Sequence, residues 1–303
     1  MGVSTAVVRT QLATANMLGE GIVWCPRRQA LYWTDIPAAT LWRHDPATQR
    51  TDAWPMPERL ACIALCADPD WLLLGLASRL AFLHLPDGAL EPIAEVEPDL
   101  PTRLNDAACD RQGRFVFGTL DESDPQRPIG SFYRLDADLS LHRLDLERIA
   151  ISNSLAFSPS GDTLYYCDTP TGRIRCCEYG ADGRVGAPRD FADLGDVDGG
   201  PDGSAIDAEG GLWNAQWGLG RVTRYRPDGR VDRHIELPAR QPTRPAFGGP
   251  ELGTMYVTSA REGLHLIDGC SDAADGHLFA VDTGVRGLPE PVFAGVPRTR
   301  NAP

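Results

Sequence analysis

A glutamate stands between two glycines in the segment Leu18-Gly19-Glu20-Gly21, directly before the apolar run Ile22-Val23-Trp24. Glycine weakens a strand and leaves no side chain to pack, so a strand gains nothing from this arrangement by itself. The arrangement makes sense where the backbone must bend tightly to point one oxygen ligand at a partner. The alternative interpretation is an exposed glycine-rich turn with a solvated glutamate.

Three other segments place polar side chains where the surrounding pattern does not call for them. They are Arg103-Leu104-Asn105-Asp106, Ile151-Ser152-Asn153-Ser154-Leu155 and Gly200-Pro201-Asp202-Gly203-Ser204. An amide in an apolar stretch needs hydrogen-bond partners when it is buried. Each segment alone is weak evidence, since Asp-Gly is often only a turn and Asn often only a cap. Because they lie about 50 residues or more apart, spacing cannot show that they converge.

The composition excludes several classes of chemistry. The chain has no lysine, so Schiff-base catalysis and a P-loop are both ruled out. It also contains no GxSxG elbow, no HExxH, no GxGxxG after a strand and no EF-hand loop, and its six histidines are scattered. The formal net charge of −13 argues against a nucleic-acid partner, which requires a basic surface.

The cysteines and the N-terminus predict a bacterial cytoplasmic protein. Eight cysteines occur without a CxxC pair or zinc-finger spacing, and several lie in apolar runs, so we expect buried free thiols in a reducing compartment. The N-terminal segment lacks the apolar core of a signal peptide. No run of about 18 apolar residues is present, so we expect no membrane span. The use of arginine alone is typical of a GC-rich bacterial genome.

The elements that must position the polar segments are short strands. Apolar and aromatic runs bounded by Gly, Pro and Asp recur along the chain, and no long segment has a 3.6-residue apolar period, so little helix is expected. Examples are 30–33, 71–74, 114–117, 163–166, 211–214 and 254–257. Trp24, Trp33 and Trp42 stand nine residues apart, as on successive hairpin strands.

These strand and turn units predict an all-β, six-bladed β-propeller with four-stranded antiparallel blades. Two hairpins make a repeat of about 45–50 residues, which is the period of a propeller blade, and no linker divides the chain. Residues 1–303 are therefore expected to form a single propeller domain. A large β-sandwich is the rival all-β fold, but evenly spaced hairpins fit it less well. The tail from Pro289 to Pro303 is expected to be a final strand with a frayed end.

Several blocks, taken together and in order, resemble the regucalcin/gluconolactonase (senescence marker protein) family, most closely its bacterial sugar lactonases. The blocks that carry the resemblance are Leu18-Gly19-Glu20-Gly21 with Trp24, Leu31–Ile36, Arg103–Asp106 through Gly118-Thr119, Ile151-Ser152-Asn153, Pro201-Asp202-Gly203 through Trp213, and Phe247-Gly248-Gly249-Pro250 through Arg261. They appear in family order from about residue 18 to residue 265.

The resemblance implies a divalent metal ion on the propeller axis, ligated by Glu20, Asn153 and Asp202. All-oxygen ligation suits Ca²⁺, Mg²⁺ or Mn²⁺, with Zn²⁺ also acceptable. It further implies substrate binding by Arg103 and Asn105. Asp202, or a metal-bound water beside it, is the predicted general base of hydrolysis. One position departs from the family pattern: a further acidic substrate contact can follow the Gly-Thr block, and Asp121, Glu122 and Ser123 all remain candidates for it.

The implied activity is hydrolysis of a small-molecule sugar lactone to its aldonic acid in sugar catabolism. L-Arabinono-, xylono-, galactono- and gluconolactone are the candidates, and a monomer or weak homodimer is expected. Four alternatives stay open. They are a non-catalytic calcium-binding or interaction propeller, a lactonase for non-sugar lactones, a lactonase for aldaric acid lactones, and a quinone-dependent sugar dehydrogenase.

Overall fold

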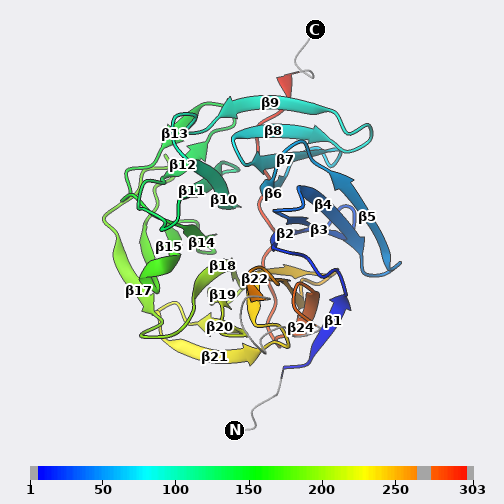
Figure 1. Ribbon diagram of the computed structural model, residues 1–303, viewed down its shortest axis with the longest axis vertical. Helices are drawn as coiled ribbons and strands as arrows, with labels where there is room; N and C mark the ends of the chain where they lie inside the picture. Colours follow the sequence, from blue (N-terminus) through cyan, green and yellow to red (C-terminus); the bar gives the residue numbers. More distant parts are fainter. Residues whose placement is uncertain (1–5, 265–273, 299–303) are drawn as a thin grey trace.

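The computed structural model describes residues 6–264 and 274–298 as six four-stranded antiparallel sheets arranged around a central axis (Figure 1). The predicted six-bladed propeller is therefore confirmed. The innermost strands begin at residues 19, 60, 102, 152, 200 and 241, so successive blades are 41 to 50 residues apart. Helical structure in the described residues is limited to short 3₁₀ segments such as η1 (Thr169–Thr171).

Each blade extends outward from one innermost strand beside the axis. From the inside out, the first contains β2 (Gly19–Cys25), β3 (Ala30–Asp35), β4 (Thr40–Asp45) and β5 (Arg50–Pro55). The second contains β6 (Leu60–Leu65), β7 (Trp71–Leu76), β8 (Arg79–His84) and β9 (Leu90–Glu95). The third contains β10 (Thr102–Cys109), β11 (Phe115–Asp121), β12 (Phe132–Leu135) and β13 (Leu141–Arg143).

The remaining blades follow the same order. The fourth contains β14 (Ser152–Phe157), β15 (Thr163–Asp168), β16 (Arg173–Glu178) and β17 (Arg189–Asp193). The fifth contains β18 (Gly200–Ile206), β19 (Leu212–Trp217), β20 (Arg221–Tyr225) and β21 (Val231–Glu236). The sixth contains β22 (Gln241–Gly248), β23 (Thr254–Ala260), β24 (Leu278–Asp282) and β1 (Val8–Leu12).

The cores between the blades explain why the inner strands are almost continuously apolar. All six residues of β6 and of β7 are buried, because both faces of these strands pack against neighbouring blades. The predicted tryptophan series is confirmed in the first blade. Trp33 on β3 lies opposite Trp42 on β4, and their rings stack with centroids 5.8 Å apart.

All six innermost strands carry the same irregularity. Each shifts register against its neighbour after its first few residues, between Glu20 and Val23 in β2, for example, and between Pro201 and Ser204 in β18. The equivalent shifts lie in β6, β10, β14 and β22. A bulge re-aims side chains that would otherwise alternate between the two faces of the sheet. The six bulges lie at the same end of the channel, and the polar segments singled out above occupy four of them.

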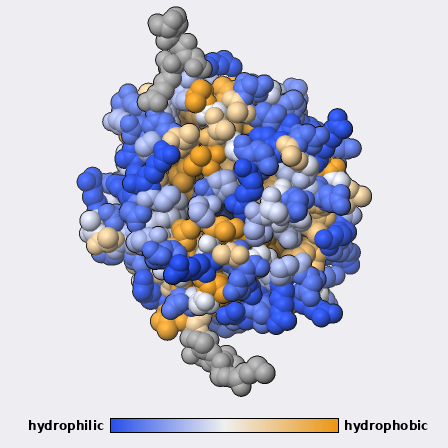
Figure 2. Space-filling model, turned by 180° about the vertical axis from the view of Figure 1, so that it is seen from behind, coloured by the Kyte–Doolittle hydropathy of each residue, from blue (hydrophilic) through white to orange (hydrophobic). Residues whose placement is uncertain are grey.

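A final strand was expected in the C-terminal tail, and this prediction is wrong for the described part of the tail, 289–298. After β24 the chain crosses the rear of the axial channel instead of joining a blade (Figure 1). Phe293 is fully buried in the core beside Phe82, and its amide donates to the carbonyl of Leu65. The rear face is mostly hydrophilic, and its hydrophobic groups lie mainly in a band through the middle (Figure 2). Aromatic burial therefore fixes the tail, which pairs only through isolated bridges.

The cysteine prediction is confirmed for the residues that the structure describes. Cys25, Cys62, Cys66, Cys109, Cys167, Cys176 and Cys177 are all free and buried, while Cys270 lies outside the described residues. In residues 6–264 and 274–298, no helix has the length and apolar character needed to cross a membrane.

Candidate functional site

The predicted site residues come together at one end of the axial channel, where the innermost strands begin. Glu20 lies on β2, Arg103 and Asn105 on β10, Asn153 on β14 and Asp202 on β18, so four blades contribute. Each residue lies at or next to the register shift of its strand. The bulges therefore bring together segments whose convergence the sequence could not show.

The two glycines around Glu20 have a steric explanation. Gly21 has φ +60°, and a Cβ there would lie 3.1 Å from the carbonyl oxygen of Ala61 on the neighbouring inner strand. A Cβ on Gly19 would lie 2.9 Å from the carbonyl oxygen of Ser259. Only glycine fits both positions, because the backbone bends sharply between two blades. The bend directs Glu20 into the channel, as its flanking residues predicted.

Glu20 and Asp202 form an acidic pair. Their carboxyl groups lie close enough to affect each other's pKa, and Asp202 is only 5% exposed. Burial raises the pKa of Glu20, although Arg244 opposes the shift. Burial and the charge of Glu20 raise the pKa of Asp202 well above its usual range. Two acids in this arrangement hold a proton between them or are compensated by a bound cation.

A chain of hydrogen bonds connects the predicted substrate residues to this pair. Arg103 donates to Asn105 Oδ1 at 2.9 Å, and Asn105 Nδ2 donates to Asn153 Oδ1 at 3.2 Å. Asn153 Nδ2 donates to Thr169 Oγ1 at 2.9 Å, and Thr169 donates to the carbonyl of Pro201, next to Asp202, at 2.9 Å. The amide groups are thus held with their oxygen and nitrogen atoms in fixed positions.

The donor set fits a hard divalent cation. Glu20, Asp202 and Asn153 offer carboxylate and amide oxygens, the ligands that Ca²⁺, Mg²⁺ and Mn²⁺ prefer. Among the described residues, no three His, Cys, Asp or Glu side chains form a group that could hold a metal ion, and the amide oxygen of Asn153 would add a further oxygen ligand to the two carboxylates. The acids with raised pKa values are the observation that favours a cation, because a positive charge between them would compensate both.

The structure distinguishes the three candidates after the Gly-Thr block. Asp121 is fully buried and accepts hydrogen bonds from Arg127 and Ser123, and Arg127 holds the pKa of Asp121 well below its usual range. Ser123 belongs to the same cluster, because its hydroxyl donates to Asp121 and accepts from Arg127. Glu122 alone lies beside the site, with Oε1 at 3.9 Å from Nε of Arg103.

The sequence did not single out Arg244 on β22, which lies deeper in the channel. It is 6% exposed, ion-paired with Asp106 of β10, and donates from NH2 to the carbonyl of Ala107 at 2.8 Å. Asp106 also accepts from the amide of Leu155 at 2.8 Å. The pair therefore ties three blades together beneath Glu20. An arginine between two prolines within the apolar run 241–248 was the available signal.

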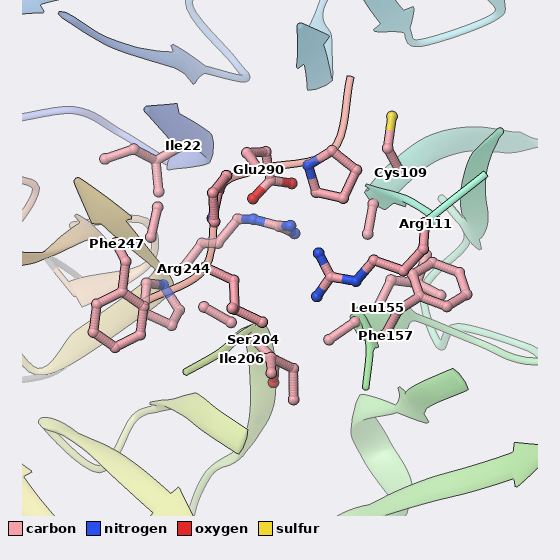
Figure 3. A pocket seen from close by; sticks show the side chains of 18 residues that line it. Ile22, Cys109, Arg111, Leu155, Phe157, Ser204, Ile206, Arg244, Phe247 and Glu290 are labelled. Atoms are coloured by element: carbon pink, nitrogen blue, oxygen red, sulfur yellow. The ribbon is translucent and has the colours of Figure 1, made fainter. Parts of the chain in front are cut away.

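A cavity of about 50 Å³ lies on the far side of this ion pair. Figure 3 shows Arg244 and Arg111 pointing toward one another across it, with Glu290 of the tail nearby. Burial raises the pKa of Glu290. The lining of this cavity includes none of the predicted site residues, so the cavity is separate from the acidic pair.

Comparison with protein-family models matches residues 18–261 to the SMP-30/Gluconolactonase/LRE-like region. The chain is 51% identical over 286 residues to L-arabinolactonase from Azospirillum brasilense, covering 94% of this chain and 95% of that protein. It is 37% identical to 6-deoxy-6-sulfogluconolactonase from Pseudomonas putida, covering 92% and 96%. The crystal structure of regucalcin from Agrobacterium tumefaciens, a calcium-binding protein, superimposes with a TM-score of 0.89 at 32% identity, covering 96% and 99%.

These findings define the class of the chain as a six-bladed propeller enzyme of the lactonase type. The chain belongs to the SMP-30/Gluconolactonase/LRE-like family, which confirms the resemblance seen in its sequence blocks. A quinone-bound aldose sugar dehydrogenase also superimposes, with a TM-score of 0.67, but at 14% identity it shows the fold alone.

Proposed function

We propose that this chain hydrolyses a sugar lactone to its aldonic acid with one divalent metal ion held by Glu20, Asn153 and Asp202. The observation that carries the proposal is the acidic pair of Glu20 and Asp202 on the channel axis. The relative named L-arabinolactonase, at 51% identity, makes L-arabinono-γ-lactone the first substrate to test. Xylono-, galactono- and gluconolactone follow it.

The chemistry needs a polarised ester carbonyl, a water nucleophile and a base. A bound divalent cation would act as a Lewis acid on the lactone carbonyl. The Asp202 carboxylate accepts the proton of the attacking water as a general base. No residue has to form a covalent intermediate, which agrees with the missing GxSxG elbow.

Arg103 and Asn105 would orient the lactone. The Arg103 side chain is 11% exposed, and its NH1 group donates to the carbonyl of Leu104 and to Asn105 Oδ1. Groups fixed in this way supply binding geometry without the entropy cost of ordering them during the reaction. The ring hydroxyls of a sugar lactone provide both donors and acceptors for these two residues.

A pH-indicator assay with a panel of sugar lactones, with and without chelator, tests the proposal. We expect acid release that chelator abolishes and that added Ca²⁺, Mn²⁺, Mg²⁺ or Zn²⁺ restores. Asp202→Asn should lose turnover with the fold intact, while Asp228→Asn, the same change in an exposed turn, should keep it. The absence of acid release on every lactone would refute the proposal, and wild-type turnover in Asp202→Asn would remove Asp202 as the base.

A further inference from the structure

One carboxylate at the channel mouth is shared by two arginines. Arg59, in the connection from β5 to β6, donates from both terminal nitrogens to Glu122, with NH2 at 2.9 Å from Oε2. The other oxygen of Glu122, Oε1, lies 3.9 Å from Nε of Arg103. The bidentate contact lowers the pKa of Glu122, so this side chain is ionised at neutral pH.

Further carboxylates act on the arginines around Glu122. Glu20 and Glu262 both act electrostatically on Arg103. Arg79, on the same face, pairs with Glu58 at 2.8 Å. In the part of the chain that the structure describes, each of these three arginines thus faces a carboxylate and none offers an uncompensated charge to a ligand.

The shared carboxylate is accessible to a substrate. The side chains of Glu122 and Arg59 are 34% and 41% exposed, so the pair lines the mouth and is not part of the core. Asp121 and Ser123, its chain neighbours, turn away to bind Arg127. A lactone held by Arg103 would therefore lie beside the charge of Glu122.

We propose, on the basis of the lactonase function above, that Glu122 is a specificity-determining residue that restricts the site to lactones with uncharged polyhydroxy substituents. A hydroxyl group can donate to Glu122 and accept from Arg103. A carboxylate or sulfonate substituent finds both arginines already occupied and meets the charge of Glu122. Like charges placed side by side at a binding surface are strongly unfavourable.

The test compares two lactones that differ only in charge at one carbon, galactono-γ-lactone and galactaro-γ-lactone. The measured quantity is the ratio of kcat/KM for the anionic lactone to kcat/KM for the neutral one. Glu122→Gln keeps the shape and frees both guanidiniums, so the ratio should rise by about tenfold or more once the like-charge contact is removed. Glu251→Gln is the matched control, since Glu251 also pairs with an arginine, Arg286 at 3.3 Å, but in the turn at the other end of β22.

A second variant separates charge from shape. In Arg59→Gln/Glu122→Gln only Arg103 is freed, so the ratio should fall between that of the wild type and that of Glu122→Gln. An unchanged ratio in Glu122→Gln, or the same change in Glu251→Gln, would overturn the inference. If the wild type hydrolyses neither lactone, the proposed function fails instead. Calorimetric binding of the same two lactones then gives the charge ratio independently of turnover.

Discussion

Replacing Asp202 by Asn should stabilise the metal-free protein although it abolishes hydrolysis. The pKa of Asp202 is raised in the folded protein by burial and by the charge of Glu20. The folded chain therefore keeps a proton that the unfolded chain loses above its ordinary pKa of about 4. The contribution of Asp202 to folding stability is fully present below the unfolded pKa. It falls as the pH rises toward the pKa of Asp202 in the folded protein.

The size of the effect follows from one retained proton. Between the unfolded and the folded pKa of Asp202, each pH unit lowers the free energy of unfolding by up to about 1.4 kcal/mol. Asparagine has no proton to lose, so the variant escapes this loss. The difference in unfolding free energy between Asp202→Asn and the wild type should widen by up to about 1.4 kcal/mol per pH unit.

Urea unfolding in the presence of chelator at pH 5, 6 and 7 measures this difference directly. Asp228→Asn, in its exposed turn, should show no widening. Added Ca²⁺ or Mn²⁺ should stabilise the wild type through preferential binding to the native state and should stabilise Asp202→Asn much less. A pH-independent difference, or equal stabilisation of both proteins by metal, would refute the assignment of Asp202 as a buried acid and ligand.

Two further predictions concern groups away from the acidic pair. Phe293→Ala should lower the free energy of unfolding by about 3–5 kcal/mol, since it empties a fully buried aromatic position. Thermal unfolding measures the loss, and Val296→Ala, an exposed neighbour, should differ little from the wild type. Arg244→Met should cost about 3–5 kcal/mol because Asp106 is left as an unpaired buried charge. The double variant Arg244→Met/Asp106→Leu should recover part of that loss, and full additivity in the double-mutant cycle would contradict the pairing.

The blades could be predicted because each one repeats local information. Short apolar runs and Asp-Gly turns specify hairpins without reference to distant parts of the chain, as the stacked Trp33 and Trp42 illustrate. Glu20 could be singled out for a similar reason. The close approaches that require Gly19 and Gly21 leave a mark in the sequence on either side of the carboxylate.

The contacts that could not be predicted from the sequence depend on closure of the ring of blades. Arg244 and Asp106 are 138 positions apart and meet only because six blades place β22 and β10 around one axis. The same holds for Arg59 and Glu122, which are 63 positions apart. The tail was misread because its prolines and Phe293 look like a strand edge, whereas burial of one aromatic ring against Phe82 decides its course.

Strand β1 is the outer edge of the sixth blade and pairs with β24, near the other end of the chain. During synthesis from the N-terminus, Val8–Leu12 leaves the ribosome before every other described strand, yet its pairing partner, Leu278–Asp282, leaves after all of them. The first five blades can assemble as they emerge, because each is contiguous in the chain. Strand β1 must wait, unpaired, until the strands of the other five blades have been made. Completion of the sixth blade is thus the step with the largest sequence separation, and we expect it to be the slow one.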